Sequence, residues 1–160
     1  MVQCKTMRIE RLRREHIPAL LEIENYCFAG SAWSEGGFLS ELEKASSLFL
    51  VAMRHEQLCG AIAADICAEQ AFISKLMVAP AVRRQGIARQ LLRALENECR
   101  QSGVSELTLE VRAGNAAARA LYESCAFSAI GERKNFYHEP KENAVIMSKY
   151  LKERYEDISD

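Results

Sequence analysis

One short stretch constrains the fold more than any other: a strand pattern that leads through a basic, glycine-containing loop directly into a helix. The apolar pattern of residues 72–78 ends at Val78, and the loop reads Arg83-Arg-Gln-Gly-Ile-Ala. Apolar residues at helical spacing follow. Unpaired backbone N–H groups and the positive end of the helix dipole point toward such a loop, and glycine lets an anion approach the backbone closely. The sequence therefore predicts a phosphate-binding site here.

The other hydrophobic patterns predict one mixed α/β domain. Strands are expected at residues 7–12, 48–53, 58–67, 72–78, 106–111, 127–137 and 144–150, with the last two forming a hairpin. Helices are expected at residues 14–26, from an N-cap at Ser34 through Leu42, and at 86–102 and 116–124. We expect residues 1–151 to form a single domain, followed by a charged tail at 152–160.

Composition narrows the possible partners. The net charge of −1 disfavours a nonspecific nucleic-acid binder, which usually carries a basic excess. The chain contains no apolar run of about 18 residues, and its start lacks the apolar core of a signal peptide. We therefore expect a cytoplasmic protein with no nucleic-acid or membrane partner. The six cysteines include no CxxC pair and the three histidines lack ligand spacing, so free thiols and no metal are expected.

A second motif stands downstream of the loop, in the sequence of residues 115–127, Asn-Ala-Ala-Ala-Arg-Ala-Leu-Tyr-Glu-Ser-Cys-Ala-Phe. Together with the loop pattern Arg/Gln-x-x-Gly-x-Gly/Ala at residues 83–88, it resembles the GNAT family of acetyl-CoA-dependent N-acyltransferases. The resemblance spans the whole chain and implies a mixed, mostly antiparallel sheet of about seven strands flanked by helices. One departure is Ala126, where the family usually has glycine.

The resemblance narrows to the RimI-type subgroup, whose members acetylate the N-terminal alanine of a small-subunit ribosomal protein. Residues 109–124, the loop 32–35 and the segment 133–137 look like that subgroup. The implied function is acetyl transfer from acetyl-CoA to the N-terminal α-amine of a protein, which would be the partner of this chain. Two alternatives stay open: a GNAT enzyme acting on a small amine such as a polyamine or antibiotic, and a non-catalytic acetyl-CoA-binding module.

By the same resemblance, a set of residues is expected to bind the cofactor. The pyrophosphate loop comprises Arg84, Gln85, Gly86, Ile87, Ala88 and Arg89. The backbone of Leu76, Met77 and Val78 would hydrogen-bond the pantetheine arm. Asn115, which the pattern also predicts as a helix N-cap, would touch the cofactor. The alternatives are a solvated basic turn for Arg83 and Arg84, and purely structural strand positions for residues 76–78.

Acetyl transfer to an amine needs a base for the attacking amine and a proton donor for the departing thiolate. Glu110 alternates with apolar residues along its strand, so it faces away from their side. Glu110 is therefore either a general base or a solvated charge at the end of a strand. Tyr122 is either a core tyrosine or a phenolic acid. The resemblance implies the base role for Glu110 and the acid role for Tyr122.

By the same resemblance, two aromatic residues are candidates for the substrate groove. Trp33 precedes the second predicted helix, and Tyr137 belongs to the predicted hairpin. Each has a structural alternative, as a buried staple and as a hairpin aromatic, respectively. The sequence contains no serine, histidine and acid arrangement for a covalent nucleophile. We therefore expect direct attack of the amine on the thioester in a ternary complex.

Overall fold

The computed structural model describes residues 6–28 and 31–151, so the predicted charged tail at 152–160 lies outside the described residues. The described chain forms two compact units. The N-terminal unit holds residues 6–65 and 75–95, apart from 29–30, and the C-terminal unit holds residues 66–74 and 96–151.

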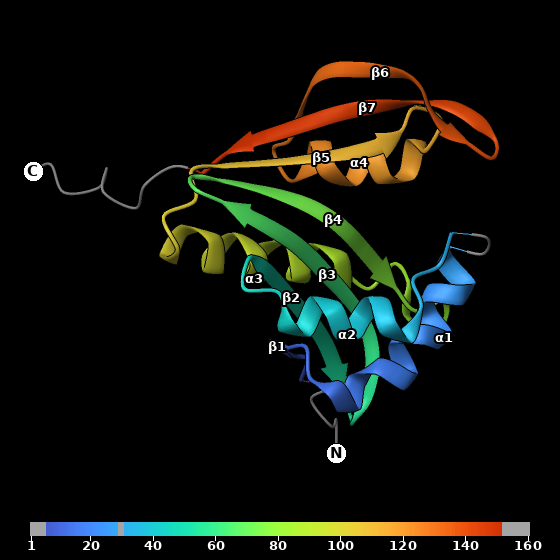
Figure 1. The fold of residues 1–160 in the computed structure, drawn as a ribbon, viewed down its shortest axis with the longest axis vertical. Helices are drawn as coiled ribbons and strands as arrows, with labels where there is room; N and C mark the ends of the chain where they lie inside the picture. Colours follow the sequence, from blue (N-terminus) through green and yellow to red (C-terminus); the bar gives the residue numbers. More distant parts are fainter. Residues whose placement is uncertain (1–5, 29–30, 152–160) are drawn as a thin grey trace, which may run out of the picture. The chain divides into compact units, whose positions relative to one another are not determined.

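Within the described residues, seven strands and four α-helices confirm the expected mixed α/β fold (Figure 1). The strands are β1 (Arg8–Arg11), β2 (Ser47–Arg54), β3 (Gln57–Cys67), β4 (Gln70–Val78), β5 (Glu106–Arg112), β6 (Ser128–His138) and β7 (Lys141–Tyr150). The helices are α1 (Ile17–Cys27), α2 (Glu35–Glu43), α3 (Ile87–Gln101) and α4 (Ala116–Ser124). The strand order is β1-β2-β3-β4-β5-β7-β6. β4 pairs with β5 in parallel, whereas β1–β2, β2–β3, β5–β7 and β6–β7 are antiparallel.

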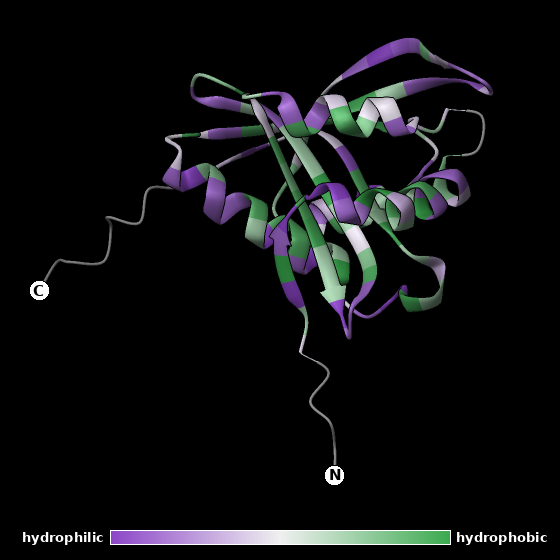
Figure 2. Cartoon of the chain, turned by 60° about the horizontal axis from the view of Figure 1, so that its bottom comes forward, coloured by the Kyte–Doolittle hydropathy of each residue, from purple (hydrophilic) through white to green (hydrophobic). Residues whose placement is uncertain are grey.

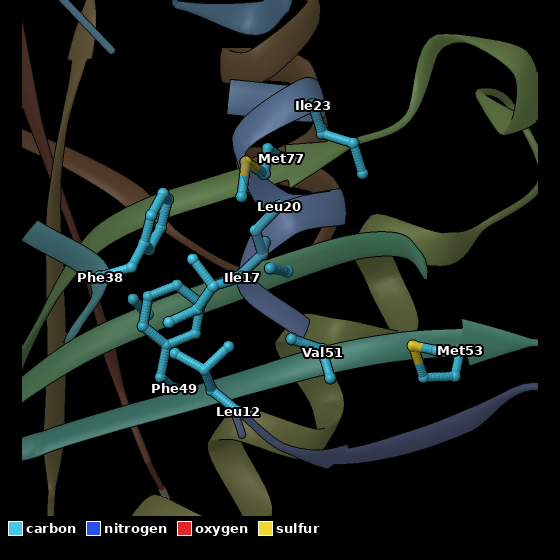
Figure 3. Packing of buried hydrophobic residues seen from close by; sticks show 11 residues of the cluster. Leu12, Ile17, Leu20, Ile23, Phe38, Phe49, Val51, Met53 and Met77 are labelled. Carbon is cyan, nitrogen blue, oxygen red and sulfur yellow. The ribbon is translucent and has the colours of Figure 1, made fainter. Parts of the chain in front are cut away.

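The core of the N-terminal unit lies where α1 and α2 pack on the strands β2, β3 and β4 (Figure 3). Ile17, Leu20 and Ile23 recur at helical spacing and bury one face of α1. Phe38 from α2 is fully buried and meets Phe49 of β2 edge-on, with 6.0 Å between ring centroids. The position of β4 is therefore fixed from this face by well-packed side chains.

Local side-chain chemistry explains where the first helices begin. The Ser34 side chain accepts a hydrogen bond from Gly37 N at 3.2 Å, which confirms the predicted N-cap of α2. The first helix differs from the prediction, because residues 14–16 form a separate 3-10 turn and α1 begins at Ile17. The His16 ring accepts from Arg13 N at 2.9 Å and closes that tighter turn.

In the C-terminal unit, strand β5 alternates strictly between buried and half-buried residues. Its buried residues Leu107, Leu109 and Val111 share one face, and α4 runs beside the strand (Figure 1). β6 is an edge strand of this unit with almost entirely exposed residues. Figure 2 shows hydrophobic and hydrophilic residues alternating along the helices, as amphipathic helices require.

Candidate active site

The predicted phosphate loop joins the end of β4 to the start of α3 within the N-terminal unit. Gly86 has a φ of 77°, a left-handed conformation that costs glycine little, and Arg84 has a φ of 61°. A Cβ on Gly86 would meet no heavy atom within 4 Å, so the space beside this backbone is open. α3 begins at Ile87, and the N–H groups of its first turn have no partner within the helix. The loop therefore has the shape and polarity to bind an anion.

Two exposed side chains of this loop, Gln85 and Arg83, form hydrogen bonds with the rest of the unit. Gln85 accepts a hydrogen bond from Arg54 at 2.7 Å, which ties the loop to β2. Arg83 Nε donates to a main-chain carbonyl of β4 at 3.3 Å. Arg84 and Arg89 have exposed side chains. The exposed guanidinium groups of Arg84 and Arg89 are therefore candidates to bind a phosphate.

The loop is preceded by a short 3-10 turn, Pro80–Val82, that the sequence patterns did not predict. Ile87 is buried and Ala88 is half-buried, so these two residues offer mainly backbone to the loop. Ala79 N donates to Cys59 O at 2.7 Å and fixes the start of the turn against β3. Proline at the beginning of a short helical turn is favourable because its missing N–H needs no partner there.

The backbone of β4 from Leu76 to Val78 is the predicted partner of the pantetheine arm. Met77 is buried in the core of the N-terminal unit, whereas Leu76 and Val78 are half-buried. A Cβ at Gly60 of β3 would lie 2.6 Å from the Met77 carbonyl oxygen, so only glycine permits this close approach. Residues 76–78 therefore have a structural role in the sheet, and this role is compatible with cofactor binding by their backbone.

Glu110 lies on β5 of the C-terminal unit, with its side chain only 13% exposed. Its neighbours Leu109 and Val111 are buried on the opposite face, as the alternation predicts. The carboxylate forms an ion pair with Arg133 of β6, with 3.1 Å between Nε and Oε1. Glu110 is thus neither a fully solvated charge nor a fully buried one.

Tyr122 is a buried residue of α4, with 9% of its surface exposed. Its ring meets that of Phe127 edge-on at a centroid distance of 5.7 Å. Burial raises the pKa of Tyr122 to about 12, and the neighbouring Tyr137 and Cys125 add to the rise. The phenol is therefore fully protonated at neutral pH and can only donate a proton there.

Tyr137 brings these candidates together within the C-terminal unit. Burial raises its pKa, and the nearby carboxylate of Glu110 raises it further. The guanidinium of Arg112 opposes that rise and stacks 4.2 Å from the ring centroid. Tyr137 also adds to the rise in the pKa of Tyr122, so Glu110, Tyr137 and Tyr122 lie in the same region of the C-terminal unit.

Asn115 occupies the N-cap position of α4, as predicted. Its side-chain oxygen accepts from Ala118 N at 3.2 Å, and its carbonyl oxygen accepts from Arg119 N at 3.1 Å. The neighbouring Gly114 N donates to Glu142 at 2.6 Å, which holds the turn against β7. These contacts establish the capping role of Asn115 and leave its predicted contact with the cofactor as a prediction.

Trp33 lies in the N-terminal unit, just before α2, and is half-buried. Its ring is 5.5 Å from that of Phe38, which fits the predicted role as a staple ahead of the helix. The predicted substrate residues Trp33 and Tyr137 therefore belong to different units, as do the predicted cofactor loop and the catalytic pair.

The sequence patterns did not single out several charged residues that form contacts in these regions. Arg133 and Arg112 were not singled out as partners of Glu110 and Tyr137, because both pairings join distant strands. Lys75 and Glu24 were also missed, although a signal existed for each. Lys75 continues the buried row of Ile73 on β4, and Glu24 lies on the buried face of α1.

Two further features were sought among the residues that the structure describes. Within residues 6–28 and 31–151, no group of three or more His, Cys, Asp or Glu side chains is arranged to hold a metal ion. No helix among these residues has the length and apolarity needed to cross a membrane. The described cysteines, at positions 27, 59, 67, 99 and 125, are free thiols, as expected.

Comparisons with known proteins support the resemblance. The chain is 36% identical over 146 residues to a ribosomal protein bS18-alanine N-acetyltransferase of Haemophilus ducreyi, with 89% of this chain and 99% of the relative covered. It is also 36% identical over 142 residues to the enzyme of that name from Escherichia coli strain K12, covering 88% and 95% of the two chains.

Solved structures agree with this. The ribosomal-protein-S18-alanine N-acetyltransferase crystal structure from Escherichia coli matches with a TM-score of 0.83 and 31% identity, covering 97% of this chain and 100% of that one. At the level of fold alone, the PaiA N-acetyltransferase from Thermoplasma acidophilum, solved with coenzyme A, matches with a TM-score of 0.76 and 22% identity, covering 91% and 99%.

The sequence model of the Acetyltransferase (GNAT) family matches residues 10–127, which include the basic loop, Glu110 and Tyr122. GNAT acetyltransferases use acetyl-CoA. The family model covers well over half of the chain, and the alignments with the relatives cover nearly all of the described residues. The chain therefore belongs to the Acetyltransferase (GNAT) family.

Proposed function

We propose that this chain transfers the acetyl group of acetyl-CoA to the N-terminal alanine of a ribosomal protein of the bS18 type. The observation that carries the chemistry is that one unit holds both a largely buried carboxylate, Glu110, and a buried phenol, Tyr122, that is protonated at neutral pH. The substrate follows from relatives of that name that match almost end to end. We further propose that residues 1–151 act as one catalytic domain and that the protein works in the cytoplasm.

In this proposal the basic loop holds the cofactor. The first N–H groups of α3 and the side chains of Arg84 and Arg89 bind the pyrophosphate, and the open space at Gly86 admits it. The backbone of residues 76–78 binds the pantetheine arm and Asn115 contacts it as well. Bound acetyl-CoA supplies the thioester carbonyl. All of these contacts come from the chain's own main chain, the two arginines and Asn115, without a metal.

The two proposed catalytic residues handle different proton transfers. An α-amine has a pKa of about 8 and must lose its proton to attack the carbonyl, so Glu110 accepts that proton directly or through a water molecule. The new C–N bond forms and the C–S bond breaks in a ternary complex. Tyr122 donates its phenolic proton to the departing sulfur and regains one from solvent. Trp33 and Tyr137 contact the acceptor peptide.

The test is acetyl-CoA turnover with peptides that differ only in their N-terminal residue, beside a panel of small amines such as polyamines. A preference for an N-terminal alanine peptide is expected. A preference for a small amine would replace the proposed substrate, and cofactor binding without turnover of any amine would leave only a binding module.

Two variants separate binding from chemistry. Tyr122→Phe is expected to keep acetyl-CoA affinity and to lose most of its turnover, because only the proton donor is removed. Gly86→Trp is expected to lose acetyl-CoA binding, measured by calorimetry, because a large side chain fills the open space beside the loop. Unchanged turnover in Tyr122→Phe would remove Tyr122 from the mechanism.

A further inference from the structure

A buried ion pair in the N-terminal unit has no part in the chemistry proposed above. Lys75 on β4 and Glu24 on α1 are 7% and 0% exposed. Lys75 Nζ donates a hydrogen bond to Glu24 Oε1. Two charges withdrawn from water are costly, and a buried pair is weak evidence for stability by itself. The contacts around this pair suggest what else it does.

The same carboxylate oxygen also binds the main chain at a proposed substrate residue. Trp33 N donates to Glu24 Oε1 at 2.9 Å, so Lys75 and Trp33 share one acceptor. The second oxygen, Oε2, is buried and has no hydrogen-bond partner within the described residues. Glu24 is therefore held through a single oxygen, between a strand and the residue that precedes α2.

The ammonium group of Lys75 also contacts the aromatic rings directly. Its Nζ lies 4.5 Å from the centroid of the Trp33 ring and 4.3 Å from that of Phe28. Both distances are within the range of cation–π attraction, which strengthens when the cation is desolvated. Trp33 is thus fixed twice by one buried pair, at its backbone N–H through Glu24 and at its ring through Lys75.

We propose that Lys75 is a positioning residue that acts through Glu24 and Trp33 to set the Trp33 ring for the acceptor substrate. This inference rests on the proposed function, in which Trp33 contacts the acceptor peptide. Lys75 is buried and acts through Trp33, so it need not contact the acceptor amine. The predicted effect therefore falls on recognition of the acceptor and leaves recognition of acetyl-CoA intact.

Trp33 is the only tryptophan of the chain, so its fluorescence reports this arrangement independently of activity. The test compares the wild type with Lys75→Met, which keeps an unbranched side chain and removes the charge. The matched control is Lys44→Met, because Lys44 forms an exposed pair with Asp65 at 2.6 Å in the same unit. Both variants are measured for acrylamide quenching of Trp33 and for KM of the alanine peptide and of acetyl-CoA.

The expected result for Lys75→Met is a raised quenching constant and a KM for the peptide raised about tenfold, as for a moderate coupling between contacting residues. The KM for acetyl-CoA is expected to change by less than about twofold. Lys44→Met should match the wild type in every measurement. The double variant Glu24→Gln/Lys75→Met, with no uncompensated charge, serves in the same assays if the single variant does not fold.

Two results would overturn the inference. One is Trp33 quenching that does not change when Lys75 is replaced. The other is a change in quenching with no change in KM for the acceptor that the wild type uses, whether peptide or small amine. If the wild type uses a small amine, the proposed substrate fails while the positioning role is still decided by that KM. A wild type that acetylates no amine at all would overturn both proposals.

Discussion

Glu24 with Lys75 in the N-terminal unit and Glu110 with Arg133 in the C-terminal unit are both carboxylate–cation pairs that involve a strand of the sheet. They differ in exposure, chiefly at the cation. The side chains of Lys75 and Glu24 are 5% and 0% exposed, whereas those of Arg133 and Glu110 are 58% and 13% exposed. The buried pair adds contacts to Trp33 and Phe28, and the exposed one adds a more distant contact between Arg133 and Phe136.

The difference in exposure implies a difference in use. Water cannot replace either partner of the buried pair, so Lys75 and Glu24 stay where packing holds them. Arg133 reaches Glu110 from the solvent side, and such a contact is easily exchanged for water. A carboxylate that can exchange its partner is suited to accept a proton, and one that cannot is suited to hold a loop. Burial rather than chemical type therefore separates the two proposed roles.

The largest expected effect breaks the buried pair. Lys75→Met leaves the charge of Glu24 buried without a cation, and we expect the free energy of unfolding to fall by about 3–5 kcal/mol. Urea unfolding followed by circular dichroism measures it. The double variant Glu24→Leu/Lys75→Met should recover most of the loss, since no charge remains. A loss below about 1 kcal/mol in the single variant would mean that the pair is not desolvated.

A second prediction tests the other carboxylate through activity. Glu110→Gln keeps the size of the side chain and removes its ability to accept a proton, so kcat should fall by about a hundredfold or more. The free energy of unfolding should change by less than about 1 kcal/mol. Glu106→Gln is the matched control, because Glu106 lies on the same strand and the same face. An unaltered kcat in Glu110→Gln would exclude it as the base.

The sequence predicted those features whose cause is local. Ser34 and Asn115 have side chains that cap helices, and both do so. The orientation of Glu110 follows from the two-residue period of a strand. The basic loop before α3 was predicted from its position between a strand and a helix. In each case the residues that decide the outcome lie within a few positions of one another.

Features that depend on distant residues were not predicted. Lys75 and Glu24 are 51 positions apart, so nothing local shows that two charged residues on buried faces neutralise each other.

Ala126 has a φ of 71°, so the turn before Phe127 keeps a left-handed backbone even without the glycine usual in the family. The packing of Phe127 against Tyr122 explains how such a turn is held, since Phe127 N also donates to Tyr122 O.

The C-terminal unit has a buried titratable group of its own, which gives a third prediction. The pKa of Tyr122 rises from 10.0 to about 12 on folding, because burial disfavours the phenolate. The free energy of unfolding is therefore unaffected by this phenol below pH 10, where it is protonated in both states. Between pH 10 and about 12 the unfolded chain loses the proton first, so the protein becomes less stable as the pH rises. At pH 11 the loss is about 1.4 kcal/mol relative to neutral pH.

Urea unfolding of the wild type and Tyr122→Phe at pH 8 and pH 11 measures this loss as a difference between the two proteins. Burial also raises the pKa of Cys99, to about 11, but both proteins share that thiol and its effect cancels. Equal pH dependence in the two proteins would show that folding does not raise the pKa of Tyr122.

The prediction with the smallest expected effect tests whether burial explains the difference in stability contribution between the two ion pairs. Arg133→Met removes the cation beside Glu110, and because Arg133 is more than half exposed we expect the free energy of unfolding to fall by less than about 1 kcal/mol. Salt should shrink the loss further, since exposed charges are screened. Urea unfolding at low and high salt measures both quantities. A loss as large as that of Lys75→Met, insensitive to salt, would show that Glu110 is held as firmly as Glu24, and the partner exchange that suits it to be a base would then be excluded.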